Sequence, residues 1–166
     1  MSQPTPGIAI GPASARRTAA DQHRVLLARI GAERFAFPLG DLLEAVDAPE
    51  VTPLVLAPNG VVGQCVHRGR LLAVFDGGAL VGVPRTGGAG SLLVVSGAEP
   101  GFGLWVDDVE DMVFAPRRAW RALPADGARV GGVLRALLAL DDGLAALVDM
   151  ESVRATVAAR LNPGAR

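Results

Sequence analysis

The chain has 166 residues, of which half are hydrophobic, and its 16 basic and 17 acidic side chains nearly cancel. This composition supplies a sizeable core and excludes a disordered chain, while the balanced charge disfavours nucleic acid or an anionic membrane as a partner. The 21 glycines and 12 prolines exclude a long helical bundle, and the single Cys65 excludes an internal disulfide or a zinc site of several cysteines.

Residues 1–23 contain three prolines and no apolar periodicity, which predicts a flexible leader that plays no part in the fold. They lack the basic start and the long apolar stretch of a secretory signal. No apolar run in the chain approaches the ~20 residues of a membrane span, so we expect a soluble protein. A reducing, cytoplasmic compartment fits the single cysteine.

The first half of the chain predicts short strands separated by turns. Residues 25–30 and 35–37 flank Gly31-Ala32 as a β-hairpin, which Pro38 ends because proline has no N–H to donate. Gly40-Asp41 then opens a short turn or helix whose apolar face would be Leu42, Leu43 and Val46. Further strands are expected at 51–56, 61–66 and 71–75, with Arg68-Gly69 as a turn and Asp76-Gly77-Gly78 as the end of the last strand.

The second half begins after residues 83–90 (VPRTGGAG), a polar, glycine-rich stretch typical of a surface connection. Strands are expected at 91–96, 103–106 and 112–114. Residues 134–140 and 144–150 flank Asp141-Asp142-Gly143 and predict a hairpin, although the same residues would also suit a helix. Val153, Val157 and Leu161 recur at helical spacing, so a helix is predicted over 151–161.

Many short strands with one late helix predict an all-β protein, built as a barrel or a pair of barrels. The polar stretch at 83–90 divides it into lobes of roughly residues 24–85 and 86–150. Each lobe is near the lower size limit for an independent core, so we expect the two to share a buried interface.

Few side chains suggest chemistry. Cys65 and His67 share a strand face and are candidates for a nucleophile or two metal ligands, but no third group follows at a recognisable spacing. The competing interpretation is a buried thiol beside a partly exposed histidine. The acidic cluster of Asp107, Asp108, Glu110 and Asp111 lacks the spacing of a calcium loop and is read as a solvated strand end. No catalytic motif stands out, which favours a binding surface over an active site.

Residues 61–76 (VVGQCVHRGRLLAVFD) resemble the signature of the CheW-like family, which runs roughly G-x-x-N-L-R-G-x-x-x-P-V-x-D-L. The resemblance extends from about Arg24 to Arg154, with supporting segments at 27–39, 51–54, 103–110 and 140–149. The chain departs from the pattern at Val66-His67, where the family usually has Asn-Leu, and at Ala73 and Gly77, where it usually has Pro and Leu.

This resemblance implies an all-β fold of two SH3-like five-stranded barrels packed together, intertwined, with a short C-terminal helix. The CheW-like domain would cover residues 24–154, and residues 151–166 would form the C-terminal helix and tail. It implies no catalysis and no cofactor or metal. The implied function is a scaffold of a bacterial chemosensory array that couples chemoreceptors to the histidine kinase CheA. The alternative is a CheW-like regulator of a pilus-motility or other non-chemotaxis pathway with a different partner.

The resemblance also implies where partners bind. Arg68, with His67 and Gly69, would contact the cytoplasmic tip of a methyl-accepting chemoreceptor. Glu44, with Leu42 and Leu43, would face the regulatory domain of CheA. Such a protein is cytoplasmic and recruited to membrane receptor arrays, without inserting into the membrane or binding nucleic acid. The residues themselves leave another interpretation of Arg68 open, an internal ion pair to Asp76 across the hairpin.

Overall fold

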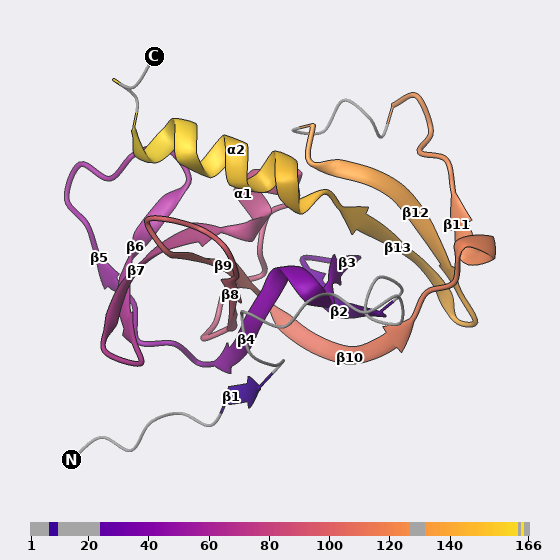
Figure 1. Cartoon of the computed structure of the whole chain (residues 1–166), viewed down its shortest axis with the longest axis horizontal. Helices are drawn as coiled ribbons and strands as arrows, with labels where there is room; N and C mark the ends of the chain where they lie inside the picture. The colour runs from indigo at the N-terminus through magenta and orange to yellow at the C-terminus, as the bar shows by residue number, and fades with distance from the viewer. Residues whose placement is uncertain (1–6, 10–23, 127–131, 163, 165–166) are drawn as a thin grey trace.

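The computed structural model describes residues 7–9, 24–126, 132–162 and 164 (Figure 1). They form two β-sheets, each of which combines antiparallel pairs with one parallel pair. Within the described residues, no helix is long and apolar enough to cross a membrane. The prediction of an all-β fold with a late helix is therefore confirmed.

The larger sheet has seven strands in the order β1-β4-β8-β9-β7-β6-β5. All neighbours are antiparallel except β7 and β9, which run parallel. The strands are β1 (Gly7–Ala9), β4 (Leu42–Asp47), β5 (Thr52–Pro53), β6 (Val61–His67), β7 (Arg70–Asp76), β8 (Ser91–Val95) and β9 (Phe102–Val106).

The smaller sheet has six strands in the order β10-β2-β3-β13-β12-β11, with β3 and β13 parallel. Its strands are β2 (Arg24–Ile30), β3 (Glu33–Pro38), β10 (Asp108–Phe114), β11 (Trp120–Arg121), β12 (Leu134–Leu140) and β13 (Gly143–Val148). The helices are α1 (Gly77–Val81), α2 (Met150–Leu161) and the short 3₁₀ segments η2 (Leu39–Asp41) and η3 (Arg117–Ala119).

Several local predictions are confirmed, because their signals lie within one turn and its two flanking strands. The hairpins β2–β3, β6–β7 and β12–β13 form where the alternation and the turn residues place them. The helix expected over 151–161 is α2, which begins after Asp149, whose carboxylate accepts the Glu151 N–H at 3.2 Å. Figure 1 shows α2 following directly from β13.

Two local predictions are wrong. The helical face proposed for Leu42, Leu43 and Val46 is instead strand β4, because its backbone pairs with β1 and β8. The strand expected over 51–56 shortens to β5, since the chain turns away at residues 55–56, where Leu56 has a φ of 59°. The expected end of β7 at Asp76 is confirmed, and helix α1 starts there because the Asp76 carboxylate accepts the Gly78 N–H at 2.8 Å.

The backbone pairing bears on two expectations about domain organisation. Residues 7–9 pair with β4 as an edge strand, so part of the leader joins the fold; residues 1–6 and 10–23 lie outside the described part of the chain. The lobes predicted at 24–85 and 86–150 are not separate either. β8 and β9 complete the seven-stranded sheet, and β2 and β3 belong to the six-stranded one. The two halves of the chain thus exchange strands between the sheets. Long-range backbone pairing decides this exchange, and no local sequence pattern reveals it.

The core has three parts, and strands such as β2 and β8 contribute to two of them because both of their faces are buried. In β2, Leu26, Ala28 and Ile30 enter a core shared by both sheets, while Val25 and Leu27 enter a core of the six-stranded sheet. In β8, Leu93 and Val95 enter the same shared core. Leu92 and Val94 enter a small core of the seven-stranded sheet that also holds Cys65, Leu72 and Val74.

Helix α2 fixes the two sheets further. Its buried side chains Met150, Val153 and Val157 join the shared core. Arg154 on the same helix donates to the Ser96 carbonyl at 2.9 and 3.1 Å and to the Asp41 carboxylate at 2.9 Å. These bonds join the C-terminal helix to the chain just before β4 and just after β8.

We expect Leu93→Ala to lower the free energy of unfolding by about 2–5 kcal/mol, because it leaves a cavity in the shared core. The matched substitution Leu144→Ala, at a half-exposed position of β13, should change it by less than about 1 kcal/mol. Urea unfolding of both variants followed by circular dichroism measures the difference. Equal effects would contradict the placement of the shared core.

Candidate functional site

A groove of about 730 Å³ opens on the seven-stranded sheet beside the β6–β7 hairpin. Its lining combines apolar side chains with charged ones. The small core of that sheet lies beneath it, since Leu72 and Val94 belong to both. The lining residues are Leu43, Glu44, His67, Arg68, Arg70, Leu72, Val94, Val95, Gly97, Ala98, Glu99 and Gly101.

At one end of the groove, Glu44 meets two side chains of the hairpin. Glu44 Oε2 lies 2.8 Å from His67 Nε2 and accepts a hydrogen bond from Arg68 Nε at 3.0 Å. The Glu44 side chain is 9 % exposed, His67 20 % and Arg68 72 %. A carboxylate that is mostly withdrawn from water is stabilised by these donors, while the guanidinium of Arg68 stays in reach of a partner.

The β6–β7 turn fixes the position of Arg68 at the tip of the hairpin. His67 pairs with Arg70 across the hairpin, so Arg68 and Gly69 form a two-residue turn, and both have positive φ values of 48° and 75°. Such a turn matches the twist of the flanking strands, and glycine adopts it freely, whereas arginine does so at a small cost. The paired strands hold Arg68 at the hairpin tip.

A second ion pair lines the groove, in which Arg70 Nη2 lies 3.0 Å from Glu99 Oε1. Both side chains are mostly exposed, so this ion pair contributes little to stability. It joins β7 to the segment before β9.

The structure unites residues that were predicted for two separate surfaces. Glu44, predicted for the kinase side, contacts His67 and Arg68, predicted for the receptor side. Leu43 lines the same groove, whereas Leu42 is only 3 % exposed and belongs to the shared core, so it offers no contact area. The alternative interpretation of Arg68, an internal ion pair, is confirmed, but its partner is Glu44 and not Asp76, which caps α1.

Sequence reasoning missed the rest of the lining. Arg70, Glu99, Leu72 and Val94 come from three segments whose proximity depends on the parallel β7–β9 pairing and the β8–β9 hairpin. The alternation in β7 signals that Leu72 is buried, but nothing local signals that Glu99 faces Arg70.

Exposed apolar side chains occur at two places on the seven-stranded sheet. Val66 and Leu71 are cross-strand partners, 73 % and 61 % exposed. Between β5 and β6, Val55 and Leu56 are 92 % and 97 % exposed. Apolar side chains so far out of the core mark a contact surface when they cluster.

The Cys65–His67 pair does not form a reactive site. Cys65 is buried in the small core, and burial raises the pKa of its thiol, which disfavours the nucleophilic thiolate. His67 is turned to Glu44 instead. In residues 24–126 and 132–162, no three side chains of the metal-binding types gather into a site.

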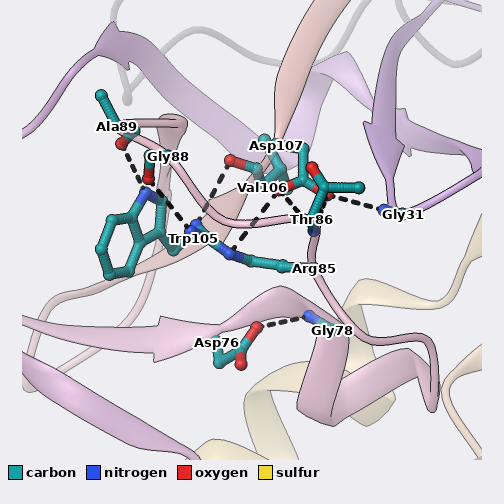
Figure 2. Close-up of polar contacts among 10 residues, drawn as sticks. All are labelled: Gly31, Asp76, Gly78, Arg85, Thr86, Gly88, Ala89, Trp105, Val106 and Asp107. Atoms are coloured by element: carbon teal, nitrogen blue, oxygen red, sulfur yellow. Dashed lines mark hydrogen bonds and ion pairs between the residues drawn. The ribbon is translucent and has the colours of Figure 1, made fainter.

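The acidic cluster after β9 is not simply a solvated strand end, because Asp107 is 2 % exposed at its side chain. Figure 2 shows its carboxylate facing two backbone donors: Oδ2 accepts the Gly31 N–H at 2.6 Å and the Thr86 N–H at 3.0 Å. Burial by itself raises the pKa of Asp107, but these hydrogen bonds outweigh it and hold the pKa below its ordinary value.

Arg85 and Trp105 complete this arrangement (Figure 2). The Arg85 guanidinium carbon lies 3.9 Å from the centre of the Trp105 ring, and Trp105 Nε1 donates to the Ala89 carbonyl at 2.9 Å. The predicted surface connection 83–90 is therefore fastened at both ends to the β9–β10 junction. These side chains satisfy one another and serve the structure.

A second hollow of about 510 Å³ lies where the N-terminus of α2 meets the six-stranded sheet. Its charged lining consists of Arg117, Arg135 and Arg154 against Asp41, Asp149 and Glu151. Three cations face three carboxylates, so no net charge selects a ligand there.

Comparisons with known proteins agree with this architecture. A family model described as CheW-like domain matches residues 24–157. The crystal structure of the scaffolding protein TtCheW from Thermoanaerobacter tengcongensis is similar to this chain, with a TM-score of 0.67 and 17 % sequence identity over 76 % of this chain and 88 % of that one. At this identity the likeness concerns the fold, that of two SH3-like barrels. No curated protein matches the sequence significantly.

We expect Asp107→Asn to lower the free energy of unfolding at pH 7 by about 1–3 kcal/mol, because an amide replaces a carboxylate that accepts two buried backbone N–H groups. Since the folded-state pKa is lowered, this stabilisation is present above about pH 4 and is lost as the pH falls through the folded pKa.

Urea unfolding between pH 3 and 7 tests this. The difference between wild type and Asp107→Asn should shrink toward pH 3. The neighbouring exposed Asp108→Asn should show a much smaller difference throughout. A difference independent of pH would contradict the role of the charge.

Proposed function

This chain belongs to the CheW-like domain family, and from that premise we propose that it is a non-enzymatic adaptor of a bacterial chemosensory array. In this role it couples the cytoplasmic tip of a methyl-accepting chemoreceptor to the histidine kinase CheA. The observation that carries the proposal is the groove on the seven-stranded sheet, with an apolar floor and the exposed Arg68 at its edge. Its charged groups pair with one another, which suits binding and leaves no poised acid or base.

We propose that the receptor tip binds in this groove. Leu43, Leu72 and Val94 supply apolar area, and Arg68 supplies a guanidinium for a carboxylate on the receptor hairpin. The contact area is small and rimmed by charge, so the affinity should be modest and reversible. Such a contact suits an assembly whose members respond to signals.

For the kinase contact we propose a surface other than Leu42, Leu43 and Glu44. Leu43 and Glu44 lie in the same groove as Arg68, so a kinase domain bound there would exclude the receptor. An adaptor must hold both partners at once. We therefore place the CheA regulatory domain on the exposed apolar side chains Val55 and Leu56 between β5 and β6.

We expect Arg68→Glu to weaken binding of the receptor tip at least about tenfold, because it replaces the exposed cation of the groove with an anion. The control is Arg24→Glu, an equally drastic reversal at an exposed position of β2. Isothermal calorimetry with a receptor hairpin peptide, alongside melting curves, measures both effects. Unchanged affinity with unchanged melting would reject the receptor assignment.

We expect the double substitution Val55→Ser and Leu56→Ser to abolish micromolar binding of the CheA regulatory domain, about −8 kcal/mol, with no loss of stability since both side chains are exposed. Leu144→Ser, on the six-stranded sheet, is the control. Binding that survives the double substitution would move the kinase contact elsewhere. If the wild type binds neither CheA nor a receptor, the alternative function becomes the preferred one: a regulator of a pilus-motility or other non-chemotaxis pathway.

A further inference from the structure

The Glu44 carboxylate has one more donor than an ion pair requires. Arg68 alone would neutralise it, yet His67 Nε2 also lies 2.8 Å from the same oxygen. A carboxylate offers acceptors only, so this contact is favourable when Nε2 carries a hydrogen. His67 is therefore a second donor to Glu44 at the edge of the groove.

The charge of the groove depends on this histidine. The other charged groups that line it are Glu44 from β4, Arg68 at the turn, Arg70 from β7 and Glu99 before β9, and they cancel. The Cys65 thiol shares the strand face of His67, and burial raises its pKa, so it stays neutral. Histidine changes charge between about pH 5 and 8. Protonation of His67 thus gives a neutral groove one net positive charge.

Arg68 is positioned to bind a partner when this positive charge is added. It uses only Nε toward Glu44, and its two terminal nitrogens meet no acceptor in the described part of the chain. Its side chain is mostly exposed. The two terminal N–H groups match the two oxygens of a carboxylate. When protonated His67 also donates to Glu44, the ion pair between Arg68 and Glu44 holds Arg68 less tightly.

We propose that His67 makes this groove a pH-dependent binding site that favours an acidic, apolar partner segment when the histidine is protonated. His67 then holds Glu44, and Arg68 and the added positive charge meet the carboxylate of the partner. The proposal rests on the function proposed above, since it takes the groove as the receptor contact. His67 acts as a positioning residue through Glu44 and Arg68.

The first experiment needs no partner. The Arg68 Nε–H and the Gly69 amide of the full chain are followed by NMR from pH 8.5 to 5.5. In wild type both should shift along with the His67 imidazole. In His67→Leu and His67→Gln the shift should be lost, whereas His23→Gln, which removes the other histidine of the chain, should keep it. Identical profiles in wild type and His67→Leu overturn the proposal.

The second experiment measures affinity for a receptor hairpin peptide at pH 8 and pH 6. Wild type and His23→Gln should bind about threefold or more tightly at pH 6, because opposite charge strengthens association. His67→Gln keeps a donor that does not titrate, so its affinity should stay constant, as should that of His67→Leu. An equal pH response in all four proteins overturns the inference and leaves the adaptor function standing. If none binds at either pH, the adaptor function fails, and the NMR profiles alone decide the role of His67.

Discussion

Strands β2 and β8 each bury both faces, and the arrangement of the two sheets depends on this. Because alternate side chains point to opposite faces, each strand supplies the shared core and a second core at the same time. Neither sheet can detach from the shared core without exposing these strands. The parallel pairs β7–β9 and β3–β13 follow from the same exchange, since each joins strands that are distant in sequence.

The groove on the seven-stranded sheet is supported by these doubly buried strands. Its floor is the outer part of the small core, whose β8 side chains are anchored by their neighbours in the shared core. Around this floor, charged side chains are arranged in pairs, Glu44 with His67 and Arg68, and Arg70 with Glu99. In the proposed function, this groove would recognise a partner by its shape and by the exposed guanidinium of Arg68.

Polar side chains elsewhere fasten the connections between the sheets. Asp107 ties the β2–β3 turn and the 83–90 segment to the β9–β10 junction, and Arg154 ties α2 to the chain beside β4 and β8. Both are largely buried and satisfied by several hydrogen bonds, the condition under which a buried charge is tolerated. Each serves the fold.

The sequence alone determined the elements whose signals are local: the three hairpins, the C-terminal helix, the all-β class and Arg68-Gly69 as a turn. Through the resemblance to the CheW-like family, it also predicted Arg68 and Glu44 as binding residues. Only the tertiary structure decided that β8 and β9 complete the first sheet, that Leu42 is buried, and that Glu44 meets His67 and Arg68 in one groove. These facts depend on backbone pairing between distant segments, which leaves no periodic mark on either segment by itself.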